Sequence, residues 1–124
     1  MFEVTNTPDA PAAIGPYSQA LSANGLLFAS GQIPLCPKTG EIVGENITEQ
    51  AEQSCKNVGA ILAANGLTYE NVIKTTCFLA EMADFAAFNE VYAKYFTGKP
   101  ARSCVAAKAL PKGVLCEIEV IAVK

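Results

Sequence analysis

The 124-residue chain contains no histidine at all, and only one of its nine basic residues, Arg102, is an arginine. Without histidine, Ser-His-Asp and Cys-His catalysis are excluded, together with histidine-ligated metals and the usual acid–base group near neutral pH. An enzyme with this composition has to work with carboxylates, tyrosine, cysteine, lysine, arginine, backbone groups and water.

Charged residues are scarce as well, at 17% of the chain against 51% apolar residues, and the formal net charge is −3. A protein that binds nucleic acid independently of sequence needs a basic stripe that displaces counterions from the phosphates. No stretch of this chain concentrates lysine and arginine, which argues against such a partner. A small domain with so few charges is expected to cover some apolar surface between subunits, so we predict an oligomer.

Long apolar runs and a secretory signal are also absent from the sequence. No segment approaches the roughly 18 apolar residues of a membrane-spanning helix, and residues 1–6 have neither a basic region nor an apolar core. The five cysteines form no Cys-x-x-Cys pair, which disfavours both a zinc site and a disulfide framework. We therefore expect no membrane contact, no metal site and a reducing, cytoplasmic location.

The pattern of turns and periodicities predicts two helices among several strands. Residues 1–16 are expected to be extended because their prolines rule out a helix, and Asn24-Gly25 predicts a tight hairpin. A helix is expected from its N-cap Thr48 to Asn65-Gly66, with one apolar face formed by Ala51, Cys55, Val58 and Leu62. Strands are predicted at 17–23, 26–30, 71–80, 102–108 and 114–123, with a further short one within the turn-rich segment 33–44, at 41–43.

The second predicted helix follows Asp84, its expected N-cap, and stops before Gly98 and Pro100. Phe85, Phe88, Tyr92 and Tyr95 form an aromatic stripe along this helix. We interpret the stripe as part of the core rather than as a platform for a cofactor. The order of elements predicts one α+β domain over residues 1–124, with a single mixed sheet and both helices on one face. The other face is the natural surface for contact between subunits.

Arg102 is the first candidate for a functional residue. A guanidinium presents a rigid fork of donors that matches a carboxylate or phosphate in two-point contact, which lysine cannot copy. Arg102 stands between a Pro-Ala lead-in and a β-rich run, with two carboxylates downstream. The pattern favours an anion-binding site, and the alternative is a surface arginine on an edge strand.

Glu117 and Glu119 are two residues apart on the last predicted strand and therefore point to the same face. Carboxylates on an otherwise apolar strand face need a partner or solvent, because an unpaired buried carboxylate is costly. Either this end of the strand is solvated, or one glutamate handles water or a proton near the anion held by Arg102. The spacing alone does not decide between the two.

Three further places are candidates for lining a pocket. Tyr17 offers a phenol where a turn becomes a strand, and Ser30-Gly31 can bring backbone groups close to a ligand because glycine lacks a side chain. Cys104 lies two residues after Arg102 and shares its strand face. Without a histidine to lower its pKa, we do not interpret Cys104 as a nucleophile.

Four segments together resemble the Rid (YjgF) family of reactive intermediate deaminases. They are GPYSQA at 15–20, SGQIP at 30–34, PARSCV at 100–105 and EIE at 117–119. The likeness runs along the whole chain in order and points to the archetypal deaminase branch, which carries this arginine. It implies a chorismate-mutase-like fold and a homotrimer with clefts between neighbouring subunits.

The resemblance also implies an activity. Such proteins hydrolyse 2-imino acids, for example 2-iminopropanoate and 2-iminobutanoate, to 2-keto acids and ammonia without a cofactor, and so remove reactive enamine and imine intermediates. Arg102 would clamp the substrate carboxylate and Glu117 would position or activate water. The residues implied to line the cleft are Tyr17, Ser30, Gly31, Asn89 and Cys104.

Two other functions stay open at this level. A small-molecule-binding or regulatory trimer with little catalysis would use Arg102 equally well, because binding a carboxylate needs no activated water. Ribonuclease or translation inhibition, which has been attributed to some relatives of this family, fits poorly with the acidic charge and the missing histidine.

Overall fold

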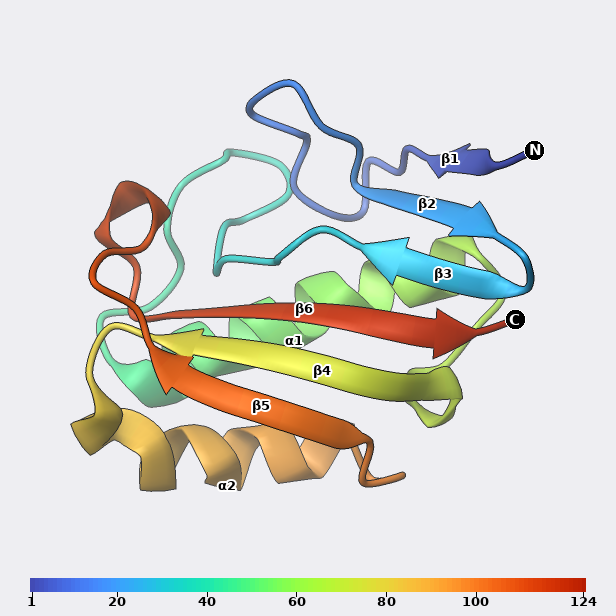
Figure 1. Ribbon diagram of the computed structural model, residues 1–124. Coiled ribbons are helices and arrows are strands. Elements are labelled where there is room, and N and C mark those ends of the chain that lie inside the picture. The colour runs from blue at the N-terminus through green and yellow to red at the C-terminus, as the bar shows by residue number, and fades with distance from the viewer.

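The computed structural model describes residues 1–124 and contains one six-stranded β-sheet with two α-helices on one face (Figure 1). The strands lie in the order β1-β2-β3-β6-β4-β5. This is the α+β architecture with a single mixed sheet that the sequence predicts. The strands are β1 (Glu3–Thr5), β2 (Ala20–Ala23), β3 (Leu26–Ala29), β4 (Val72–Leu79), β5 (Ala101–Ala106) and β6 (Cys116–Val123), and the helices are α1 (Ile47–Ala64) and α2 (Phe85–Tyr95).

The sheet is mixed because α2 forms a crossover between two neighbouring strands. β4 and β5 pair in parallel, and a parallel pair needs a long connection, which α2 provides. All other strand pairs are antiparallel. The C-terminal strand β6 lies in the middle of the sheet, and β5 forms one edge.

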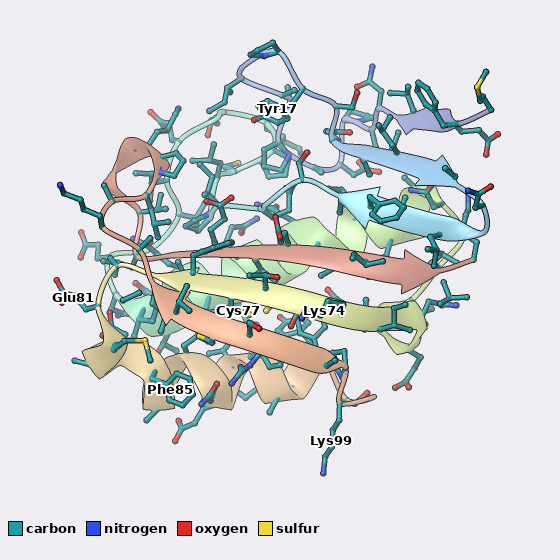
Figure 2. All side chains as sticks on the ribbon, viewed as in Figure 1. Tyr17, Lys74, Cys77, Glu81, Phe85 and Lys99 are labelled. Atoms are coloured by element: carbon teal, nitrogen blue, oxygen red, sulfur yellow. The ribbon has the colours of Figure 1, made fainter.

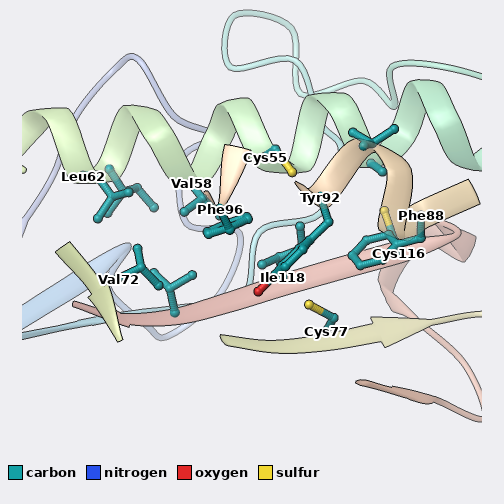
Figure 3. Packing of buried hydrophobic residues seen from close by; sticks show 14 of the residues in the cluster. Cys55, Val58, Leu62, Val72, Cys77, Phe88, Tyr92, Phe96, Cys116 and Ile118 are labelled. Atoms are coloured by element: carbon teal, nitrogen blue, oxygen red, sulfur yellow. The ribbon is translucent and has the colours of Figure 1, made fainter. Parts of the chain in front are cut away.

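Alternation along the strands separates a buried sheet face from an open one. On β6 the residues beneath the helices are at most 2% exposed, whereas the glutamates between them lie on the open face. The apolar face predicted for the first helix is fully buried against the sheet. Figure 3 shows Cys55 and Val58 of α1 on the side of the core opposite Ile118 of β6, with Tyr92 and Phe96 beside them.

The aromatic stripe of α2 belongs to the core, as predicted. Phe88 and Tyr92 are buried, and Phe85 and Tyr95 pack against the same cluster. The five cysteines are all free, and three of them are buried. No helix has both the length and the apolar character needed to cross a membrane.

Two predictions in the first half of the chain are wrong. Residues 41–43 form no strand, because Ile42 makes only an isolated bridge to Leu35. A strand that the sequence did not predict, β1, lies within the extended segment 1–16 and pairs with β2. β2 itself starts at Ala20 rather than at residue 17, so Tyr17 lies in a loop.

The predicted helix caps also need correction. The cap of α1 is Asn46, whose side chain accepts a hydrogen bond from the Glu49 amide at 2.9 Å; Thr48 lies inside the first turn. Asp84 precedes α2 but its side chain makes no cap hydrogen bond, because a 3₁₀ turn over Met82–Asp84 leads directly into the helix. The C-terminal end of α1 is as predicted, with Gly66 in the left-handed region at φ 72°.

Candidate functional site

Arg102 lies on the edge strand β5 and turns its side chain toward α2, where three side chains surround it. Its Nη1 donates a hydrogen bond to Asn89 Oδ1 at 2.8 Å. The guanidinium carbon lies 4.7 Å from the ring centroid of Tyr92 and 5.5 Å from that of Phe85. Arg102 is therefore half-buried and held on several sides, unlike a free surface arginine on an edge strand.

No carboxylate compensates the charge of Arg102. The only ion pair in the molecule joins Lys124 to Glu3 at 3.8 Å, and Asn89 and the two rings are uncharged. The remaining guanidinium N–H groups have no acceptor within the chain. Beside them runs an open groove lined by Asn89, Tyr92, Ala93, Phe96, Thr97, Lys99, Pro100 and Arg102. This arrangement can take up a small anion.

Glu117 lies half-buried on the open face of β6, against the backbone of Gly31. A Cβ atom at position 31 would overlap the carboxylate oxygen Oε2 of Glu117 and lie 2.7 Å from its Cδ. The glycine is thus what makes room for the carboxylate, since its φ is not in the left-handed region. Burial raises the pKa of the Glu117 carboxyl, and the neighbouring Glu119 raises this pKa further.

The loop that carries Tyr17 is fastened to the end of β3. Ser30 Oγ donates to the Ser18 carbonyl at 2.6 Å, and the Tyr17 hydroxyl accepts a hydrogen bond from the Ile14 amide at 3.1 Å. Tyr17, Ser30, Gly31 and Glu117 consequently share one groove. The residues that line it are Ile14, Tyr17, Ser30, Gly31, Ile33, Pro111, Glu117 and Glu119.

Arg102 and Glu117 do not meet within one chain. Thr75 of β4 pairs with Arg102, whereas Phe78 of β4 pairs with Glu117. Residues an odd number of positions apart on a strand point to opposite faces, so Arg102 lies on the helix side and Glu117 on the open side. The expectation of a glutamate beside the anion held by Arg102 therefore fails for a single subunit.

The predicted site residues thus form two groups, which we call the arginine half-site and the glutamate half-site. The arginine half-site contains Arg102, Asn89 and Cys104, which shares the strand face of Arg102. Burial raises the pKa of the Cys104 thiol although Arg102 opposes this, which disfavours the thiolate that a nucleophile requires. The glutamate half-site contains Glu117, Tyr17, Ser30 and Gly31. Figure 2 shows that Tyr17 of the glutamate half-site and Phe85, whose ring faces Arg102, lie on well-separated parts of the molecule.

Sequence reasoning missed the side chains that hold Arg102. Phe85 and Tyr92 were assigned only to the core, yet both rings also face the guanidinium. The available signal was Asn89, which stands four residues after Phe85 and three before Tyr92 and so places an amide within the aromatic stripe.

Comparison with known proteins gives consistent results. Residues 7–124 match the family model described as Endoribonuclease L-PSP. A protein of Lactococcus lactis that carries the name of a regulator, AldR, is 56% identical over 98% of this chain and 97% of its own length. Reactive Intermediate Deaminase A of Arabidopsis thaliana is 53% identical over 97% of this chain and 65% of its own length. The 2-iminobutanoate/2-iminopropanoate deaminase of Mus musculus is 48% identical over 98% and 91%.

Solved structures of similar sequence share the fold of this chain. The Rid-family protein YyfA of Yersinia pestis superimposes with a TM-score of 0.96 at 48% identity and full coverage of both chains. Escherichia coli TdcF, determined with bound serine, gives a TM-score of 0.93 at 46% identity, with 98% of each chain covered. The chain therefore belongs to the Endoribonuclease L-PSP family, the family of the Rid (YjgF) proteins that its sequence motifs resemble.

Proposed function

We propose that this protein is a deaminase that hydrolyses 2-imino acids, such as 2-iminopropanoate and 2-iminobutanoate, to 2-keto acids and ammonia without a cofactor. The observation that carries the proposal is Arg102, a half-buried guanidinium with no carboxylate partner beside an open groove. Such a group fits the carboxylate of a small 2-imino acid in two-point contact. A relative at 48% identity bears the name of this activity, and a relative at 53% identity is named as a reactive intermediate deaminase.

We further propose that the working site lies between two copies of the chain in a homotrimer. The arginine half-site of one copy would meet the glutamate half-site of the next, a head-to-tail contact that closes into a ring. The open sheet face supports this assembly because it exposes apolar side chains that a second copy would cover. These are Val4, Phe28, Val105 and Val123, each 40–58% exposed.

The proposed reaction adds water to the imine carbon and then breaks its bond to nitrogen. Arg102 holds the carboxylate, and Glu117 takes a proton from the attacking water as the C–O bond forms. Glu117 returns this proton to the nitrogen, which gives the carbinolamine. Glu117 then carries the remaining hydroxyl proton to the amino group as the C–N bond breaks, which releases ammonia and leaves the 2-keto acid. A glutamate whose pKa is raised by burial suits both steps, because proton transfer is most efficient when the pKa approaches the working pH.

The remaining residues of the two half-sites define a small pocket in this proposal. Tyr17, Ser30 and Gly31 would line it from the side of Glu117, and Asn89 and Cys104 from the side of Arg102. Serine, the ligand named for the TdcF structure, is a small amino acid with a free carboxylate. This supports a substrate with a short side chain.

The test is a coupled assay in which an amino-acid oxidase generates 2-iminopropanoate in place and the release of pyruvate is followed. We expect the unmutated protein to accelerate release, and Arg102→Ala to lower kcat/KM by about 100-fold or more because the clamp is lost. Lys94→Ala, which removes an exposed cation from α2, the helix that Arg102 faces, is the matched control. Release at the uncatalysed rate with unmutated protein would refute the proposal.

A regulatory binding protein is the second candidate, favoured by the name of the Lactococcus relative. Glu117→Gln separates the two functions. Binding of pyruvate, measured by calorimetry, should persist in this variant in either case. Turnover by the unmutated protein and its loss in the variant identify an enzyme, whereas pyruvate binding with no turnover in either protein identifies a binding protein.

A further inference from the structure

We propose that Phe85, Tyr92 and Asn89 are positioning residues, an uncharged cradle that fixes the Arg102 guanidinium for carboxylate binding while leaving its charge free. The role of these residues in binding a substrate carboxylate rests on the proposed function. Its geometry stands on contacts within one chain.

The cradle holds the guanidinium by two kinds of contact. The rings of Tyr92 and Phe85 lie at 4.7 Å and 5.5 Å from the guanidinium carbon, within the range of a cation–π interaction. Asn89 accepts one N–H at 2.8 Å and so fixes rotation of the group in its plane. Ring faces and an amide together define both position and orientation.

The Tyr92 ring is itself immobilised from below. Its hydroxyl shares a 2.7 Å hydrogen bond with Thr75 Oγ1, which is fully buried, and its ring stacks on Phe96 at 4.5 Å with 24° between the planes. Thr75 is also the residue that pairs with Arg102 across β4 and β5. The paired residues Thr75 and Arg102 thus supply, respectively, the hydrogen bond that holds the Tyr92 ring and the guanidinium that packs on this ring.

The chemical nature of the cradle explains why it suits a clamp. A carboxylate in place of Asn89 would form an ion pair and compete with the substrate for the guanidinium. An amide oxygen and two ring faces stabilise the cation without neutralising it. Arginine also has a long side chain with much rotamer freedom, and holding it in place before binding avoids losing that freedom when the anion arrives.

Two substitutions on the same helix test the cradle. Phe85→Leu removes a ring face from Arg102 but keeps apolar bulk at a half-buried position, and we expect it to raise KM for 2-iminopropanoate about two- to fivefold with kcat nearly unchanged. Phe88→Leu makes the same change at a fully buried ring that does not face Arg102. It should lower Tm more than Phe85→Leu and leave KM as it is.

A nuclear magnetic resonance measurement reads the cradle independently of activity. Arg102 is the only arginine, so the protein has a single arginine Nε–Hε signal, and we expect the ring faces beside it to shift this signal upfield. Phe85→Leu and Tyr92→Leu should move this signal toward its position in a free peptide, and Phe88→Leu should not. Should Tyr92→Leu fail to fold, Phe85→Leu carries the comparison.

The outcomes separate the two proposals. An unmutated protein without deaminase activity would overturn the proposed function, and the cradle would then be decided by the Nε–Hε signal alone. A signal that Phe85→Leu leaves in place would overturn the cradle, whatever the activity. A rise in KM for Phe88→Leu equal to that for Phe85→Leu would do the same.

Discussion

Arg102 and Glu117 are both half-buried and neither has an ion-pair partner, yet the chain holds them in different ways. The guanidinium is stacked on two rings and hydrogen-bonded to Asn89. The carboxylate makes no hydrogen bond in the chain and has a second carboxylate, Glu119, two residues away. The cation is stabilised where it lies, whereas the anion is destabilised.

Under the proposed function, this contrast separates a group that binds from a group that reacts. A clamp must keep its charge and its place, and the surroundings of Arg102 secure both without a counterion. A group that exchanges protons needs both of its protonation states within reach, and burial together with Glu119 raises the pKa of Glu117 in that direction. The predictions below disturb one half-site at a time.

Among substitutions that keep both Arg102 and Glu117, the largest effect is expected from Gly31→Ala, which disrupts the glutamate half-site by displacing the Glu117 carboxylate. The new Cβ would overlap the Glu117 carboxylate, and the flexible side chain would swing away rather than the backbone. We expect kcat to fall about 100-fold with little change in Tm, because a shift of about 1 Å in a reacting group has this consequence.

Gly98→Ala is the matched control, since its Cβ would meet only the Glu70 carboxylate, whose nearest atom, Oε2, lies at 3.2 Å. We expect this variant to retain its activity. Activity of Gly31→Ala equal to that of Gly98→Ala would show that the position of Glu117 is irrelevant to turnover.

A smaller effect is expected from Asn89→Asp, which gives the arginine half-site the counterion that it lacks. The new carboxylate would lie within hydrogen-bond distance of Arg102 and compete with the substrate, so KM should rise about tenfold. Steady-state kinetics with 2-iminopropanoate measure this, with Glu90→Gln on the exposed neighbouring position as the control. An unchanged KM would mean that the free charge of Arg102 is not used for binding.

The smallest effect is a shift in pH dependence for Glu119→Gln. In the proposed reaction Glu117 acts first as a base, so activity is lost as the pH falls through its pKa, which burial and then Glu119 raise. Removing the charge of Glu119 leaves burial as the remaining cause and lowers this pKa. The acid limb of the kcat/KM profile should therefore move to lower pH. A limb that stays in place or moves to higher pH would contradict the role given to Glu119.

Sequence patterns predicted the parts of the fold that depend on local periodicity. The buried face of the first helix and the alternation of β6 both follow from spacing within one element. β1 was missed because three residues are too short for a pattern, and Asn46 was missed as a cap because Thr48 offers the same chemistry two residues later. The backbone conformation determines which of these two residues caps the helix, and the sequence alone does not reveal it.

The candidate residues of the site could be named from the sequence, but their arrangement could not. Arg102 and Glu117 stand out by composition and position, but the faces that they occupy depend on the registers of β5 and β6 against β4. A shift of one residue in either register would bring both to the same face. The contact between Arg102 and Asn89 likewise depends on how α2 packs on the sheet.

The central claim is that Arg102 of one copy works with Glu117 of another. It is tested most directly by mixing Arg102→Ala and Glu117→Gln subunits in equal amounts, after unfolding and joint refolding, and measuring pyruvate release. Each variant alone should be nearly inactive, and random mixing should restore about a quarter of the unmutated activity, because one in four interfaces then pairs an intact arginine with an intact glutamate. A mixed sample as inactive as its two components would contradict the claim.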